Sequence, residues 1–298
     1  MAAPTLDAIL GQSRPAVPAR VFQFLRRWPV IPVVILTALI VMSIFAPFVA
    51  PHPPLKANLR DRNAPPSWYA EGSSKYLLGA DHVGRDVFSR VVYGSRISLL
   101  VAAVALITGT IVGTILGLLA GFFGGIADEV IMRIVDIWFA FPFLMLALLV
   151  ALVIGTGVTT LMGLLALIVW SSYVRYIRAE VLSLRERDFV ALARVAGSST
   201  PRILFRHILP GVTNTVVVIA TLRAGQLILA EASLSFLGAG IPPPTPTWGS
   251  MIADGREYLR DAWWISVFPG LAIFLMVMSL NFLGDWMRDR LDPRLRQI

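Results

Sequence analysis

Three long stretches of this sequence carry no charged residue, and they constrain the fold more than any other feature. The uncharged runs cover 28–55, 97–127 and 137–174, with 28, 31 and 38 residues. About 20 apolar residues suffice to cross the hydrocarbon core of a bilayer. A buried helix in a soluble domain rarely needs such a length, so the chain is predicted to be an all-α integral membrane protein.

Charge is scarce and unevenly placed. Only 15% of the residues are charged, whereas soluble domains carry about 25%. The net charge of +8 is interpreted as membrane topology, because Arg and Lys gather on the cytoplasmic side of membrane proteins. The chain has no cysteine, which excludes disulfides, thiolate metal sites and cysteine nucleophiles.

The apolar pattern predicts six transmembrane helices. The first stretch is longer than the apolar part of a signal peptide and is interpreted as a retained span. The predicted spans are 30–50, 98–122, 132–154, 160–177, 214–237 and 263–284. With the N-terminus and C-terminus cytoplasmic, the inner side holds sixteen Arg or Lys, counting Arg133 and Arg175 at the inner ends of their spans, and the outer segments hold nine. This favours the orientation over the flipped one.

Five divisions of the chain follow from these spans. Residues 1–29 form a cytoplasmic N-terminal segment, and 30–50 form the first transmembrane helix. Residues 51–96 form an extracytoplasmic segment with an interfacial helix at 83–96. Residues 97–284 form a five-helix core, and 285–298 form a cytoplasmic tail.

Glycines recur every fourth residue in the second span and continue past its end, at Gly109, Gly113, Gly117, Gly121 and Gly125. Residues four apart share one face of a helix. Such a stripe lets another backbone approach closely, as in small-xxx-small packing of membrane helices. Tight packing inside the bundle is the favoured interpretation, with a hinge or subunit interface as the alternative.

The loop at 188–210 is predicted to form a helix, a turn and a second helix. Phe189, Leu192, Ala193 and Ala196 share one face of the first helix. Gly197 suits a left-handed helix end, and Ser199 or Thr200, with Pro201, suits the start of the next helix. Pro210 is expected to end it. A short amphipathic helix pair of this kind could lie on lipid or fit a groove on a partner protein.

The same loop resembles the cytoplasmic signature of ABC importer permeases, E-A-A-x3-G-x9-I-x-L-P. Ala193, Gly197, Leu209 and Pro210 match at the proper spacing. Ala191 stands where Glu is expected, Leu192 where Ala is expected, and His207 where Ile is expected. These departures leave the helix-turn-helix shape intact.

The resemblance extends over about 25–295 and points to the second, C-type permease of the dipeptide/oligopeptide/nickel import family. The segments that resemble it are 78–90, 94–99, 140–142, 206–210, 231–238, 243–249 and 284–294. It implies the ABC type-1 importer permease fold and a heterodimer with a second homologous permease. It further implies two ATPase subunits and an extracytoplasmic substrate-binding protein as partners.

The resemblance places no catalytic, cofactor-binding or metal-binding residue on this chain. Independently, the sequence lacks a phosphate-binding Gly-Lys-Ser/Thr loop, because neither Lys56 nor Lys75 follows a glycine. Any ATP hydrolysis therefore belongs to partner subunits. The residues expected to couple to the ATPase are Phe189, Leu192, Ala193, Gly197, Pro201, His207, Leu209 and Pro210.

Polar residues inside the fifth span suggest the route of the substrate. Arg223 lies near mid-depth, Gln226 one turn further, and Glu231 nearer the outer face. Intramembrane charges suggest function by default, so these three are candidates for the translocation path, with a structural ion pair as the alternative. Arg133 and Asp136 are spaced for a structural pair on one helix face.

The expected function is the import of peptides through half of a shared path. Alternatives within the family are nickel or another small solute. A stand-alone secondary transporter is a less favoured alternative, since such proteins show internal repeats or broken helices with polar midplane residues, and no repeat is evident.

Overall fold

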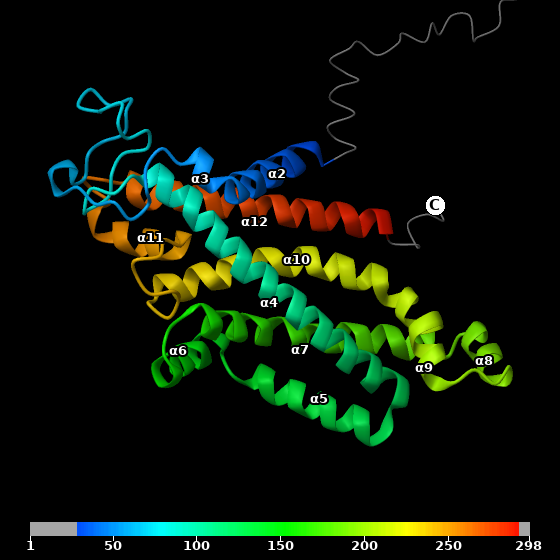
Figure 1. Ribbon diagram of the computed structural model, residues 1–298. Coiled ribbons are helices and arrows are strands. Elements are labelled where there is room, and N and C mark those ends of the chain that lie inside the picture. Colours follow the sequence, from blue (N-terminus) through cyan, green and yellow to red (C-terminus); the bar gives the residue numbers. More distant parts are fainter. Residues whose placement is uncertain (1–28, 292–298) are drawn as a thin grey trace, which may run out of the picture.

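The computed structural model describes residues 29–291 and shows a bundle of long helices with a polar loop region at one end (Figure 1). Most of the predicted N-terminal segment 1–29 and the end of the predicted tail, 292–298, lie outside the described residues. The helices are α2 (Val30–Ile44), α3 (Ala46–Val49), η2 (Leu59–Asp61), α4 (Val87–Phe123), α5 (Gly125–Ala140), α6 (Phe143–Ile154), α7 (Val158–Leu184), α8 (Asp188–Val195), α9 (Thr200–Ile203), η3 (Leu204–Ile208), α10 (Leu209–Phe236), α11 (Trp248–Gly255), η4 (Arg256–Tyr258) and α12 (Trp264–Leu291).

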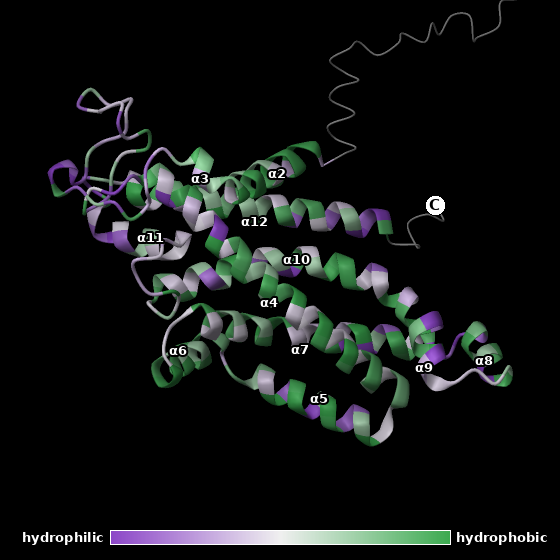
Figure 2. Cartoon of the chain, in the orientation of Figure 1, coloured by the Kyte–Doolittle hydropathy of each residue, from purple (hydrophilic) through white to green (hydrophobic). Residues whose placement is uncertain are grey.

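Four helices are long and apolar enough to cross a membrane: α4, α7, the continuous run 200–236 that contains α10, and α12. The pair α5 and α6 makes a fifth if the two count as one span. Within the described residues the molecule is therefore an all-helical membrane protein with four or five candidate spans. Hydrophobic residues predominate along these helices, and hydrophilic residues are most frequent toward the two ends of the bundle (Figure 2).

The glycine stripe packs α4 directly against α7. A Cβ atom at Gly113 would lie 2.4 Å from the carbonyl oxygen of Trp170, and one at Gly117 would lie 2.8 Å from Cβ of Ile177. Gly109 and Gly121 meet α7 equally closely, whereas Gly125 has open space around its Cβ position. We call the contact of Gly109, Gly113, Gly117 and Gly121 with α7 the glycine seam. It supports the interpretation as tight packing inside the bundle.

The third predicted span is bent, contrary to the expectation of one helix over 132–154. α5 ends at Ala140, and α6 leaves at 87° to it. Pro142 lacks a backbone N–H and disfavours the helical conformation of the residue before it, and Phe141 is extended at φ −94° and ψ 132°. The connection between the predicted spans 98–122 and 132–154 is also shorter than expected, because α5 begins at Gly125, directly after Gly124.

The start of the chain differs from the sequence expectation in two respects. The first predicted span, 30–50, is divided at Phe45 into the 15-residue α2 and the short α3. No separate interfacial helix covers 83–96: α4 begins at Val87 and continues unbroken to Phe123. Asp86 caps α4 by accepting hydrogen bonds from the backbone and the hydroxyl of Ser89, which fixes where the helix starts.

Segment 51–86 and α11 form a polar cap at the end of the bundle opposite α8 (Figure 1). Asp81 organises it by accepting hydrogen bonds from the backbone N–H groups of Val83 and Arg85 and from Nε of Arg85. The indole of Trp264 donates to the carbonyl of Ala80, 3.0 Å away. The cap is thereby bonded to α12.

Candidate functional site

The loop between α7 and α10 presents two different faces of α8. Val190 and Ala193 turn inward and are buried, whereas Phe189, Leu192 and Val195 are 44%, 68% and 87% exposed. Asp188 lies in the first turn and Arg194 in the last, which suits the helix dipole. The inner face attaches α8 to its own chain, and the outer face is apolar and open.

Gly197 makes the turn that the sequence predicted. Its φ is +72°, in the left-handed region that favours glycine. Its N–H donates to the carbonyl of Arg194, and the N–H of Ser198 donates to that of Ala193. These bonds close the end of α8 and direct the chain into α9.

The second helix of the loop does not end at Pro210. α9 leads into the π-helical turn η3, which passes directly into α10. Pro210 has no N–H to donate, and the N–H of Leu209 bonds five residues back, to the carbonyl of Leu204. The wider turn accommodates the proline at the start of α10, so the expected helix stop is wrong.

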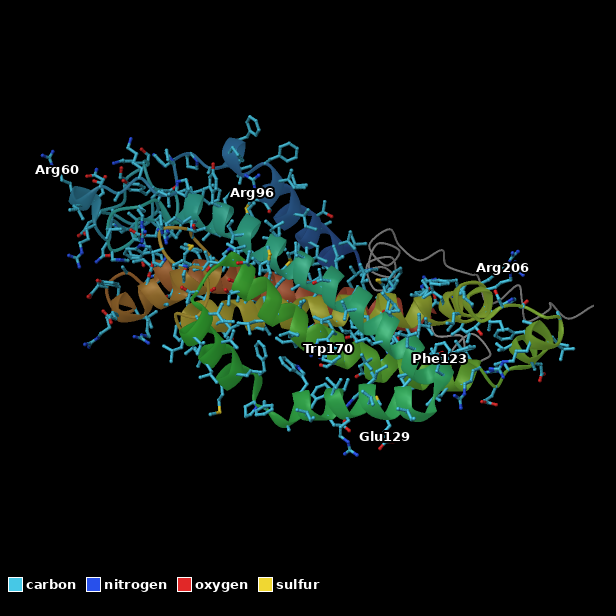
Figure 3. All side chains as sticks on the ribbon, turned by 60° about the horizontal axis from the view of Figure 1, so that its bottom comes forward. Arg60, Arg96, Phe123, Glu129, Trp170 and Arg206 are labelled. Atoms are coloured by element: carbon cyan, nitrogen blue, oxygen red, sulfur yellow. The ribbon has the colours of Figure 1, made fainter. Side chains whose placement is uncertain are left out.

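Two arginines anchor the loop to the end of α4. The guanidinium of Arg194 lies 5.7 Å from the ring centroid of Phe122, and Nη1 of Arg185 donates to the carbonyl of Gly121 at 3.0 Å. α8 and α9 stand at the end of the molecule opposite the polar cap (Figure 1). The labelled side chains show the same separation, with Arg60 and Arg96 toward one end and Arg206 toward the other (Figure 3).

The predicted coupling residues have different environments within this loop. Phe189, Leu192, Gly197, Pro201 and Pro210 are exposed, His207 and Leu209 are half-buried, and Ala193 is buried. The ring of His207 lies 6.5 Å from that of Phe189.

Val195 on α8 and Phe205 on η3 are further exposed apolar residues of the loop, with 87% and 68% exposure, and were not predicted. Their apolar character was visible in the sequence, but the π-turn that sets the direction of Phe205 was not. We call Phe189, Leu192, Val195 and Phe205 the outer apolar face.

The three candidate path residues on α10 divide into two groups. Arg223 donates a hydrogen bond to the side chain of Gln226, and both retain exposed surface. Glu231 is fully buried and accepts hydrogen bonds from the hydroxyls of Ser98 on α4 and Ser235, at 2.9 and 2.7 Å. Glu231 is therefore enclosed by its own chain, without a contribution from a partner subunit.

The expected pairing of Arg133 with Asp136 is replaced by a contact between helices. Oδ1 of Asp136 lies 2.7 Å from Nη2 of Arg175 on α7. A second pair, Asp128 with Arg178, also joins α5 to α7. Sequence spacing detects partners along one helix, but the packing of α5 beside α7 provides a better partner for Asp136.

The exposed surface of the loop is formed by apolar and basic side chains. Among residues 29–291, no group of three His, Cys, Asp or Glu side chains is placed to hold a metal ion. The outer apolar face is flanked by the exposed cations Arg194, Arg202 and Arg206.

Two family models match the chain. Residues 113–297 match the binding-protein-dependent transport system inner membrane component family. Residues 26–66 match the N-terminal transmembrane domain of oligopeptide transport permease C.

Several curated proteins are similar over most of their length. The dipeptide transport system permease protein DppC of Escherichia coli K12 is 43% identical over 90% of this chain and 89% of its own. The di/tripeptide transport system permease protein DppC of Pseudomonas aeruginosa is 40% identical over 85% of this chain and 84% of its own.

Among solved structures, a chain of the MetNI methionine ABC transporter in an inward-facing conformation is similar, with a TM-score of 0.53. It is 18% identical and covers 69% of this chain and 97% of its own. This likeness shows a shared fold.

Proposed function

The chain belongs to the family of inner membrane components of binding-protein-dependent transport systems, and from this premise we propose that it forms half of an import path for dipeptides and oligopeptides. It is a non-catalytic transport subunit of the bacterial inner membrane. The peptide substrate is supported by relatives that are 40% and 43% identical and named as dipeptide or di/tripeptide permeases.

The outer apolar face is the observation that carries the proposed link to ATP hydrolysis. A single exposed apolar side chain needs no explanation, but four of them on one short loop suggest an interaction surface. α8 is stabilised from its inner side by Val190 and Ala193 and leaves Leu192 and Val195 free for a partner groove. The partner proposed for this groove is an ATPase subunit, with its ATP bound on that subunit.

Six spans are proposed, with both termini cytoplasmic. They are α2 with α3, α4, α5 with α6, α7, α10 and α12. This count places the outer apolar face on the cytoplasmic side and the polar cap outside, facing a substrate-binding protein. The proposed division keeps 30–50 as the first span and 97–284 as the core that pairs with a second homologous permease.

Arg223 and Gln226 are proposed to line the path, because both keep exposed surface at intramembrane depth. Glu231 is instead proposed to hold α10 against α4 through Ser98, 2.9 Å away.

Experiments on the purified complex would distinguish two other functions from peptide import. A nickel-complex or small-solute importer of the same family would share the fold and the loop, so substrate uptake must be measured directly. A stand-alone secondary transporter would purify and transport without ATPase chains.

Leu192→Glu tests the docking proposal, with Ala191→Glu as a matched control on the same helix. Leu192 belongs to the outer apolar face, and a buried leucine contributes about 1.5–3 kcal/mol. We expect Leu192→Glu to weaken co-purification with the ATPase subunits about tenfold or more. Ala191→Glu places the same charge where the family signature carries Glu, and its complex should stay intact. Equal retention of the ATPase by both variants would refute the docking site.

Gly197→Pro tests whether the shape of the loop transmits movement. Proline fixes φ near −65°, which is incompatible with +72° at this position, and it removes the N–H that bonds to Arg194. We expect the variant to insert into the membrane but to import peptide at least about tenfold more slowly, a loss equivalent to about 1.4 kcal/mol. Unchanged import per inserted complex would contradict the proposal.

A further inference from the structure

Two arginines in the second half of the loop form a strip of like charge. Arg202 in α9 and Arg206 in η3 are four residues apart, and both are exposed. Residues at this spacing are neighbours on a helix surface, and like charges there destabilise the helix. Phe205, next to Arg206 in the chain, is also exposed, and Figure 3 marks Arg206 at this end of the molecule. We call Arg202 and Arg206 the basic strip.

The described part of the chain supplies no counter-charge for the basic strip. Neither arginine forms an ion pair or a side-chain hydrogen bond within residues 29–291, and residues 189–230 contain no Asp or Glu. Other arginines at this end of the bundle are neutralised. Arg178 pairs with Asp128, and the adjacent residues 185 and 186 pair with each other. The basic strip is therefore suited to carboxylates that another chain provides.

Membrane topology explains a positive cytoplasmic side but not this arrangement. The excess of Arg and Lys on that side sets a total charge and not a position on one helix surface. The loop also departs from the family signature in the same sense, because Ala191 stands where the signature has Glu. The one acidic residue of α8, Asp188, lies in the first turn of that helix, in the other half of the loop.

The length of the helix that carries the basic strip favours a protein partner over the lipid surface. The helical run 200–236 has 37 residues, which is roughly 55 Å at about 1.5 Å per residue. A bilayer with its headgroups is about 40–45 Å thick, so the run is longer than the bilayer. The basic strip lies at its start, and α8 and α9 stand beyond the ends of α4 and α5 (Figure 1). This end of the run therefore projects away from the membrane.

We propose that the surface that receives this loop is acidic, with carboxylates of an ATPase subunit that pair with Arg202 and Arg206. This rests on the proposed function and specifies the chemistry of the partner groove. The apolar floor of the groove receives the outer apolar face, and the carboxylates lie at its rim beside Phe205. Arginine binds a carboxylate through a planar fork of donors, so two such pairs fix the orientation of the loop in the groove.

The scarcity of lysine in this chain allows a direct test by carbodiimide coupling. The only lysines, Lys56 and Lys75, lie in the polar cap at the opposite end. Arg206→Lys places a side-chain amine in the basic strip, and a carbodiimide joins an amine to a carboxylate that touches it, with loss of water. In the assembled complex, position 206 should couple to an ATPase subunit, and mass spectrometry of the linked peptides identifies the partner carboxylate.

Arg288→Lys is the matched control for the coupling. Arg288 is also exposed and lies in the last turn of α12, outside the loop. Position 288 should give no adduct with an ATPase subunit. The absence of an adduct at position 206, or equal yields at positions 206 and 288, would overturn the acidic groove.

Removal of charge measures how much the basic strip contributes to docking. The double variant Arg202→Gln with Arg206→Gln should hold the ATPase subunits roughly tenfold more weakly, as expected for the loss of two solvent-exposed ion pairs. Its affinity should also depend less on salt than that of the unaltered complex, because salt screens exposed charges. Arg60→Gln with Arg288→Gln removes the same charge outside the loop and should leave the affinity unchanged. Equal affinities of the two double variants would contradict the proposal.

Lipid composition separates an acidic protein partner from an anionic membrane surface. In vesicles of phosphatidylcholine, which carries no net charge, the unaltered complex should still hold the ATPase subunits more tightly than Arg202→Gln with Arg206→Gln. A difference that appears only in vesicles with phosphatidylglycerol would assign the basic strip to anionic headgroups and overturn the proposal.

The unaltered complex separates the two levels of the proposal. If it holds no ATPase subunit, the proposed function itself fails. If it holds the ATPase subunits and position 206 of Arg206→Lys couples to none of them, only the acidic groove fails.

Discussion

α7 is held against α4 and against α5 in different ways. On the α4 side the glycine seam brings the two backbones together, with carbonyl oxygens of α7 beneath the glycines. On the α5 side the structure shows two Arg–Asp pairs and the contact of Arg175 with Phe139, and Val135 is the only buried residue of α5.

The difference separates a fixed part of the bundle from an adjustable one. Two helices whose backbones are in close contact cannot easily shift relative to each other, because protein interiors are densely packed. Ion pairs at the edge of a helix can break and re-form with other partners. We therefore expect α4 and α7 to move as one body during transport, while α5 and α6 change their contacts.

Gly113→Leu should cause the largest loss of stability of the three substitutions, because it lies in the contact of α4 with α7. Even the Cβ atom would lie 2.4 Å from the carbonyl of Trp170, so α4 and α7 must separate. Overpacking costs about 1–3 kcal/mol or more, and we expect the thermal stability of the purified complex to fall sharply. Gly163→Leu is the control, because a Cβ there has nothing within 4 Å. Equal losses in both variants would argue against the glycine seam as a rigid contact.

Asp128→Asn should have an intermediate effect. It removes the charge that Arg178 contacts through two nitrogens, and a hydrogen bond to a charged group contributes about 1.5–3 kcal/mol. Asp136→Asn makes the same change in the more exposed pair with Arg175, where an ion pair contributes only about 0–1 kcal/mol. Thermal denaturation of both purified variants compares the contributions of the two ion pairs to stability. A larger loss of thermal stability in Asp136→Asn than in Asp128→Asn would mean that the Asp136–Arg175 pair, and not the Asp128–Arg178 pair, holds α5 to α7.

Phe139→Leu should have the smallest effect. The substitution removes the ring beneath Arg175, and an exposed cation–π contact contributes about 0.5–1 kcal/mol. The thermal stability of the complex should change little, and the ion pair with Asp136 should remain. A loss comparable to that of Gly113→Leu would mean that α5 is held as firmly as α4.

The sequence predicted the packing surfaces better than it predicted their partners. The four-residue repeat of Gly109 to Gly121 indicates a contact face on one helix, but periodicity carries no information about which helix lies opposite. Asp136 illustrates the same limit, since Arg133 was near in sequence whereas Arg175 is near in space. Pairings between helices depend on tertiary packing.

Proline effects were the least predictable local feature. Pro142 interrupts the third span and bends it by 87°, although the uncharged run through it suggested a single helix. Pro210 was expected to stop a helix, yet η3 carries the chain past it. In both cases the outcome depends on whether the neighbouring backbone can find other hydrogen bonds. For the loop, the left-handed turn at Gly197 agrees with expectation. Ala193 was predicted to share a face with Phe189 and Leu192, but it is buried whereas those two are exposed.

Site-directed cross-linking from the outer apolar face tests the central claim most directly. Val195 is 87% exposed, and the chain has no native cysteine, so Val195→Cys provides one defined attachment point on this chain, and the unaltered complex is the labelling control. A short photoreactive thiol probe at this position should cross-link to an ATPase subunit, and the yield should change when ATP binds. Cross-linking to lipid alone, with no ATPase adduct in either state, would contradict the account.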